Sequence, residues 1–167
     1  KSLGLVESIP DFYPEAKWQR CVVHYYRNVF SLVPHGRRKE VATMLKAIHA
    51  QENLEEATKK KDLIAEKLEN MKLDKAAELV RSGSLETFSY YGFPVEHWKR
   101  IRTNNGLERI MKEIRRRTRV IGSFPDGESA LMLVAARLRH IAGSTWSERK
   151  YLNMDLLIDY SKEDKVS

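Results

Sequence analysis

Apolar residues recur with the spacing of an α-helix through most of the chain. Val41, Met44, Leu45 and Ile48 follow the i, i+3, i+4, i+7 pattern, which predicts an amphipathic helix over residues 38–50. The same periodicity predicts further helices over 53–72, around 76–80, as a short turn at 85–91, and over 104–117, 131–143 and 147–160. The pattern therefore predicts a mainly α-helical protein.

Candidates for β-strands are scarce. The best is residues 17–23, Lys-Trp-Gln-Arg-Cys-Val-Val, a short segment rich in residues that favour strands. One strand cannot make a sheet. The chain is therefore either all-α or a piece of an α/β domain whose other strands lie outside it.

The composition excludes several classes of protein. No apolar run reaches the roughly 18 residues that a membrane-spanning helix needs, and no apolar signal segment opens the chain. The single cysteine, Cys21, excludes an internal disulfide and is typical of a reducing compartment. We expect a soluble, cytoplasmic protein with no membrane partner, consisting of one domain or part of one within its 167 residues.

The positive charge is concentrated in one segment. The chain has 30 Lys and Arg against 23 Asp and Glu, a net charge of +7. Residues 99–119 contain nine basic and two acidic residues and so account for the whole excess, because the other residues hold 21 of each sign. Such a segment indicates a phosphate-rich partner, usually a nucleic acid. The alternative is a solvated basic surface with no partner.

Glu108 is one of the two carboxylates in this segment and stands near the start of the helix predicted at 104–117. Lys112, Arg115 and Arg119 follow it on roughly one helical face. A carboxylate among phosphate-binding cations suits metal-dependent phosphoryl transfer, since it can hold a divalent ion while the cations hold the nucleic-acid backbone.

A simpler interpretation of Glu108 is helix-start electrostatics. An acidic residue in the first turn suits the helix dipole, with Thr103 or Asn104 as the N-cap. The second carboxylate, Glu113, is expected to form a surface pair with Arg109 or Arg117.

Several separated motifs together resemble the Mutator-type transposases of bacterial insertion sequences. In chain order they are Trp18–Asn28, Thr103-Asn104-Asn105-x-x-Glu108-Arg109, Arg115–Arg119, Gly122–Gly127 and Ala136–His140. The similarity extends over nearly the whole chain. It is therefore more specific than any single short pattern.

The resemblance implies a fold and a division of the chain. The fold would be the C-terminal fragment of a ribonuclease-H-like α/β catalytic core that carries an all-helical insertion. Residues 1–36 would end the first part of the core, with its last strand at about 17–23; 37–100 would be the insertion; 101–145 would hold the catalytic-glutamate helix and the following core helix; and 146–167 would form a C-terminal helix and tail.

The resemblance also implies site residues. The family's catalytic core binds Mg²⁺ or Mn²⁺ with two aspartates and one glutamate, and Glu108 matches the glutamate. Cys21 and His24 match a Cys-x-x-His signature, which lies either near the active site or in a buried structural pair. The residues expected to contact DNA are Asn104, Asn105, Arg109, Lys112, Arg115, Arg116 and Arg119.

The implied function is DNA transposition, with strand cleavage and strand transfer at the ends of an insertion sequence. The partners would be the terminal inverted repeats, target DNA and further copies of the protein, in the bacterial nucleoid. Neither aspartate of the triad has a match here, so we expect this chain to bind metal weakly and to be inactive alone. The alternative is a non-catalytic helical DNA-binding or assembly module in which Glu108 only stabilises a helix start.

Overall fold

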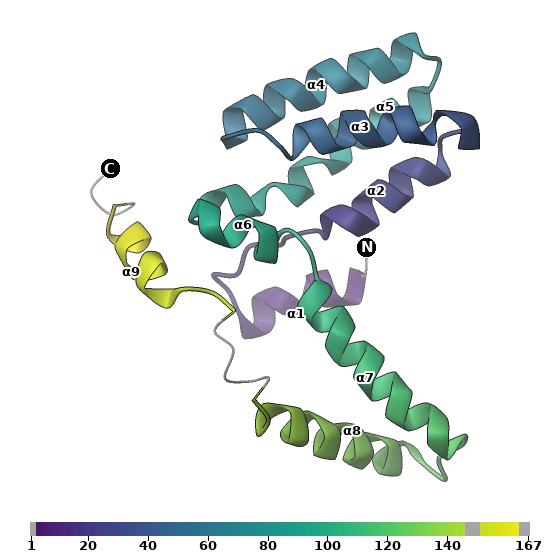
Figure 1. Cartoon of the computed structure of the whole chain (residues 1–167), viewed down its shortest axis with the longest axis vertical. Coiled ribbons are helices and arrows are strands. Elements are labelled where there is room, and N and C mark those ends of the chain that lie inside the picture. The colour runs from purple at the N-terminus through teal and green to yellow at the C-terminus, as the bar shows by residue number, and fades with distance from the viewer. Residues whose placement is uncertain (1–2, 146–150, 164–167) are drawn as a thin grey trace. The chain divides into compact units, whose positions relative to one another are not determined.

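The computed structural model describes residues 3–145 and 151–163, and every regular element within them is helical (Figure 1). The chain divides into two compact units, Lys1–Thr103 and Asn104–Ser167. The predicted mainly α-helical class is confirmed. The ribonuclease-H-like architecture and the four-part division of the chain stay predictions, since the described residues contain no sheet against which to compare them.

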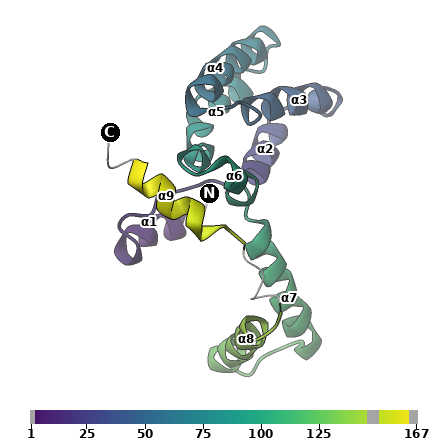
Figure 2. The same ribbon diagram turned by 60° about the vertical axis from the view of Figure 1, so that its left-hand side comes forward.

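In its described part, the first unit is built from α-helices and short 3₁₀ turns. They are α1 (Leu3–Phe12), α2 (Val22–Ser31), η1 (His35–Arg37), α3 (Arg38–Ile48), α4 (Leu54–Asn70), α5 (Asp74–Gly83), η2 (Leu85–Thr87), η3 (Ser89–Gly92) and α6 (Val95–Ile101). Helices α2, α3, α4 and α5 form a ring in which each packs against two others. Figures 1 and 2 both show these four helices side by side.

The ring encloses an apolar core. Val41, Leu45 and Ile48 of α3 are fully buried, which confirms the helix predicted at 38–50. The helix predicted at 53–72 is also confirmed, although its Leu63 is 55% exposed. Its neighbour Ile64 points into the core instead, because adjacent residues on a helix differ by roughly 100° in direction.

The strand expected at residues 17–23 does not form. The segment ahead of α2 is irregular, and α2 already begins at Val22. Its polar groups are satisfied without a β-ladder, since the Arg20 N–H donates to the Glu86 carbonyl at 2.7 Å and the Gln19 side chain to the Thr87 carbonyl at 3.0 Å. The strand prediction is therefore wrong for this structure, because the turns at 84–92 take the place of a partner strand.

The composition of α2 explains why a strand was expected where this helix begins. Its residues Val-Val-His-Tyr-Tyr-Arg-Asn-Val-Phe-Ser are rich in β-branched and aromatic types that favour strands. Tyr25 and Val29, four residues apart on one helical face, are both fully buried in the ring. Burial of that face therefore overrides the local strand preference.

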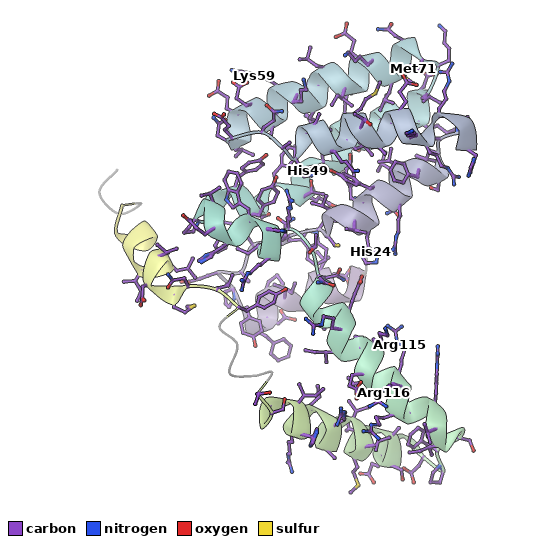
Figure 3. The ribbon with its side chains drawn as sticks, in the orientation of Figure 1. His24, His49, Lys59, Met71, Arg115 and Arg116 are labelled. Atoms are coloured by element: carbon purple, nitrogen blue, oxygen red, sulfur yellow. The ribbon has the colours of Figure 1, made fainter. Side chains whose placement is uncertain are left out.

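A chain of polar groups runs through the core of the first unit at His49, which directly follows α3 (Figure 3). Its Nδ1 lies 2.9 Å from the Tyr26 hydroxyl and its Nε2 lies 2.8 Å from the Thr87 hydroxyl. The Thr87 hydroxyl donates to the Ser84 carbonyl, so its oxygen accepts from Nε2–H of His49. Burial lowers the pKa of His49 to about 4.

The second unit contains α7 (Asn105–Ile121), α8 (Gly127–Ala142) and α9 (Met154–Glu163). Helices α7 and α8 pack against each other, and no residue of either is buried. Asp126 is the N-cap residue of α8, and its carboxylate accepts from the Ser129 N–H at 2.6 Å.

The ends of these helices differ slightly from the predictions. The helix predicted at 104–117 continues to Ile121 and stops at Gly122, whose φ of 77° is readily available to glycine. The final helix begins at Met154, while residues 147–150 of the predicted range lie outside the described part of the chain. No helix within the described ranges is long and apolar enough to cross a membrane.

Candidate nucleic-acid interface

Helix α7 carries most of the concentrated basic segment. Six of the nine basic residues between 99 and 119 lie on α7, while Lys99, Arg100 and Arg102 lie in the first unit. Arg102 is engaged there, because its Nη1 donates to the His49 carbonyl at 3.2 Å. The segment therefore divides between two units, and α7 forms the candidate interface.

The start of α7 places Asn104 at the N-cap position. Its carbonyl accepts from the Glu108 N–H at 3.0 Å, which closes the first turn. The Asn104 side chain makes no capping hydrogen bond, so this candidate cap occupies the position without using its amide. Asn105 is the first helical residue, and both amides stand at the positive end of the helix dipole.

Five of the six basic side chains of α7 occupy one continuous face. At 100° per residue, Arg109, Lys112, Arg115, Arg116 and Arg119 fall within an arc of roughly 120° that also contains Glu108. Lys112, Arg115, Arg116 and Arg119 line an open groove of about 450 Å³. Arg115 and Arg116 are labelled on this helix in Figure 3. The structure thus brings five expected phosphate-binding residues and the expected catalytic carboxylate onto one surface.

A second groove, of about 590 Å³, lies between α7 and α8. Helix α7 contributes Arg109, Lys112, Glu113 and Arg116, and the α8 side contributes Arg137, His140, Ile141 and Ser144. Arg137 and His140 are potential functional residues that the sequence reasoning did not assign. The Arg-Leu-Arg-His run at 137–140 was a usable signal, but only the packing of α8 on α7 brings it to the basic helix.

Glu113 joins the two helices through ion pairs. The Arg116 Nη2 lies 2.8 Å from Oε1 of Glu113, and the Arg116 Nε donates to Oε2 at 3.0 Å. Arg137 of α8 also pairs with Oε1, and Arg117 lies further away at 3.9 Å. Hydrogen bonding from Arg116, supported by Arg137, lowers the pKa of Glu113 to about 2, so the carboxylate stays charged.

These pairs correct the sequence expectation for Glu113. Of the two expected partners, Arg117 is present at the edge of pairing distance. The closer partners are Arg116, one turn away on the same helix, and Arg137, which is 24 residues further along the chain. A long-range partner of this kind is set by helix packing and leaves no mark in local spacing.

Cys21 and His24 lie at the start of α2 in the first unit. Cys21 is the N-cap residue with a free, partly buried thiol, and His24 is exposed on the first turn (Figure 3). Within the residues the structure describes, no three His, Cys, Asp or Glu side chains are grouped closely enough to hold a metal ion. Neither this pair nor Glu108 therefore belongs to a complete metal site in the described part of the chain.

Comparison with known proteins supplies a family. The family model described as "Transposase, Mutator family" matches residues 1–148. The transposase for insertion sequence element IS1081 from Mycobacterium tuberculosis is 34% identical over 92% of this chain and 37% of its own length. The transposase for ISRM5 from Rhizobium meliloti is 35% identical over 95% of this chain and 40% of its own length.

A third relative comes from a further bacterium. The transposase for IS256 in transposon Tn4001 of Staphylococcus aureus is 32% identical over 91% of this chain and 39% of its own length. The chain thus spans about two fifths of the length of these curated relatives. No solved structure gives a significant match.

Proposed function

This chain belongs to the Mutator family of transposases, and we propose that it forms part of a DNA-transposing enzyme in which α7 holds the DNA backbone beside a metal-binding carboxylate. The reaction would be strand cleavage and strand transfer at the ends of an insertion sequence. The observation that carries the proposal is the continuous basic face of α7 with Glu108 on the same arc.

Glu108 suits Mg²⁺ or Mn²⁺ as one ligand of several. A carboxylate is a hard oxygen donor of the kind these ions prefer, but one carboxylate holds Mg²⁺ weakly because the ion keeps its waters. The described residues contain no group of three ligands. Glu108 would therefore share its ion with the two aspartates that the family resemblance implies. The chemistry such ions supply is activation of a water or 3′-hydroxyl and stabilisation of the leaving oxygen.

The residues of α7 would position the DNA strand. Arg115, Arg119 and Lys112 stand within one to three turns of Glu108, so each can hold a phosphate near the carboxylate. Arg109 and Arg116 extend this face, and their forked guanidinium groups can hold a phosphate by two hydrogen bonds. The Asn104 and Asn105 amides would donate to the backbone at the helix start. Joining two element ends requires more than one copy, so we propose a homo-oligomer on DNA.

The test is Glu108→Gln in the longer transposase that we propose contains this chain. The substitution removes the charge but keeps the shape, so strand transfer should fall by at least about a hundredfold while DNA affinity is retained, because one lost metal ligand affects the chemical step. Glu128→Gln is the matched control, an acidic residue in the first turn of α8. Full strand transfer by the Glu108 variant, with DNA binding intact, would overturn the catalytic role.

A second candidate function is a non-catalytic DNA-binding or assembly module. It is favoured by the position of Glu108, because an acidic residue in the first turn of a helix stabilises the helix start without any metal ion. In this case Glu108 serves only as the acidic residue of the first turn of α7. Thermal unfolding of α7 would then change on Glu108→Gln, with no change in strand transfer.

A further inference from the structure

Two guanidinium groups from different helices converge on Glu113. Arg116 of α7 holds both carboxylate oxygens, and Arg137 of α8 holds Oε1. We propose that Arg116 and Arg137 form a clamp for one phosphate of a DNA backbone in the groove between α7 and α8, with Glu113 as the residue that positions both groups. The proposal rests on the DNA-binding function proposed above, and it adds α8 as a second wall of that interface.

The hydrogen bonds to Glu113 leave Arg116 able to bind an anion. A guanidinium has five N–H donors, and the pair with Glu113 uses one on Nε and one on Nη2. The opposite edge, formed by Nη1 and the second Nη2 donor, has the geometry that matches a phosphate. The Arg116 side chain is 58% exposed, so this edge can reach a ligand in the groove.

Arg137 is held more tightly than Arg116, through its pair with Glu113. Its side chain is 19% exposed, and its Nε is buried with no acceptor among the residues that the structure describes. The pair with Glu113 therefore fixes the direction of the Arg137 guanidinium. The group nevertheless lines the groove and remains partly accessible there.

The groove carries more positive charge than an ion pair that only joins the two helices would need. One carboxylate would balance one cation, but the groove walls carry Arg109, Lys112, Arg116 and Arg137 against Glu113 alone. The formal charge of these lining residues is +3. A phosphate would neutralise this positive charge and accept hydrogen bonds from the two guanidinium groups that Glu113 positions.

The clamp predicts that Arg137 contributes to DNA affinity and that a neighbouring arginine does not. Arg139 lies two residues along α8, is exposed and lines neither groove, so Arg139→Gln removes the same charge from the same helix. The probe is duplex DNA of arbitrary sequence, and affinity is measured by fluorescence anisotropy over a range of salt concentrations with this 167-residue chain. Helical content and thermal unfolding are recorded for each variant by circular dichroism.

Arg137→Gln should reduce the slope of log K against log salt by about 0.9, which corresponds to about eightfold weaker binding at about 0.1 M salt. Arg139→Gln should leave the slope unchanged. Equal slopes for the two variants, or a changed unfolding temperature with an unchanged slope, would overturn the clamp. Failure of the unaltered chain to bind DNA would instead overturn the proposed function itself.

Glu113→Gln tests positioning separately from charge. The substitution makes the chain more positive, so a diffuse basic surface would bind DNA more tightly. The clamp predicts weaker binding, because Arg116 and Arg137 lose their common anchor; tighter binding would overturn the positioning role. If Arg137→Gln lowers the helical content, Arg137→Lys is compared with Arg139→Lys. Only the former loses a positioned fork, so equal affinities would contradict the clamp.

Discussion

Helices α4 and α7 both have 17 residues, yet they contribute to the molecule in opposite ways. Helix α4 buries five side chains in the ring of the first unit, and α7 buries none. Both helices are highly charged. Helix α4 has four basic and five acidic residues, whereas α7 has six basic and two acidic residues.

The contrast separates a structural helix from the helix that we propose binds DNA. The charges of α4 are satisfied locally, as where Lys59 pairs with Glu55 at 2.7 Å and Glu56 at 3.0 Å. The excess charge on α7 has no such balance within its own sequence. Burial of its side chains stabilises α4, whereas the excess positive charge of α7 is what we propose the DNA backbone neutralises.

The largest expected difference between the units is in the response to loss of a leucine side chain. Leu45 is fully buried and Leu107 is 56% exposed. Leu45→Ala should lower the free energy of unfolding by about 2–5 kcal/mol, and Leu107→Ala should change it by no more than about 0.5 kcal/mol. Urea unfolding followed by circular dichroism measures both. Similar losses for the two variants would show that α7 contributes to a core that the described residues do not contain.

The next difference is in the response to acid. Burial holds the pKa of His49 at about 4, below the usual 6.5, so the unfolded chain binds the proton first as the pH falls. The contribution to stability is complete above about pH 6.5, is lost at roughly 1.4 kcal/mol per pH unit as the pH falls towards 4, and does not change further below that.

Unfolding measured across this pH range in His49→Gln tests the assignment. The variant should have a flatter pH dependence than the unaltered chain, and His24→Gln, which changes an exposed histidine on α2, should not. An unchanged pH dependence in the His49 variant would show that other groups cause the acid sensitivity.

The smallest predicted effect distinguishes two asparagine N-caps. The Asn53 side chain accepts from the Glu56 N–H at 2.9 Å at the start of α4, whereas the Asn104 side chain makes no capping bond at the start of α7. Asn53→Ala should therefore cost about 1 kcal/mol and Asn104→Ala close to none. Thermal unfolding of the two variants gives the comparison. A larger loss for Asn104→Ala would mean that its amide has a structural role.

The sequence predicts regular helices well where burial and periodicity agree. Residues 38–50 and 53–72 show this, because the buried positions of α3 and α4 repeat at helical spacing. Helix α2 was missed because its Val and Tyr residues favour a strand until the ring buries Tyr25 and Val29. Local preference cannot report contacts with helices that come later in the chain.

The candidate site also has a part that the sequence predicts and a part that depends on packing. The cations of α7 and the position of Glu108 follow from spacing along a single helix, so the sequence predicts that they share a face. The groove with Arg137 and His140 depends on how α8 packs on α7. Of the closer partners of Glu113, Arg116 fits a local i,i+3 spacing, whereas Arg137 was out of reach of any local pattern.

The most direct test of the central claim is the salt dependence of DNA binding by two triple variants with equal charge changes. One replaces Lys112, Arg115 and Arg119 of α7 by Gln, and the other replaces Lys39, Lys46 and Lys75, all exposed in the first unit. If α7 holds the DNA backbone, the first variant should lower the slope of log K against log salt by up to about 2.7, or about 0.9 per contact. The second variant should leave the slope unchanged. Equal changes in the two variants would contradict the account, because DNA binding would then depend on net charge and not on α7.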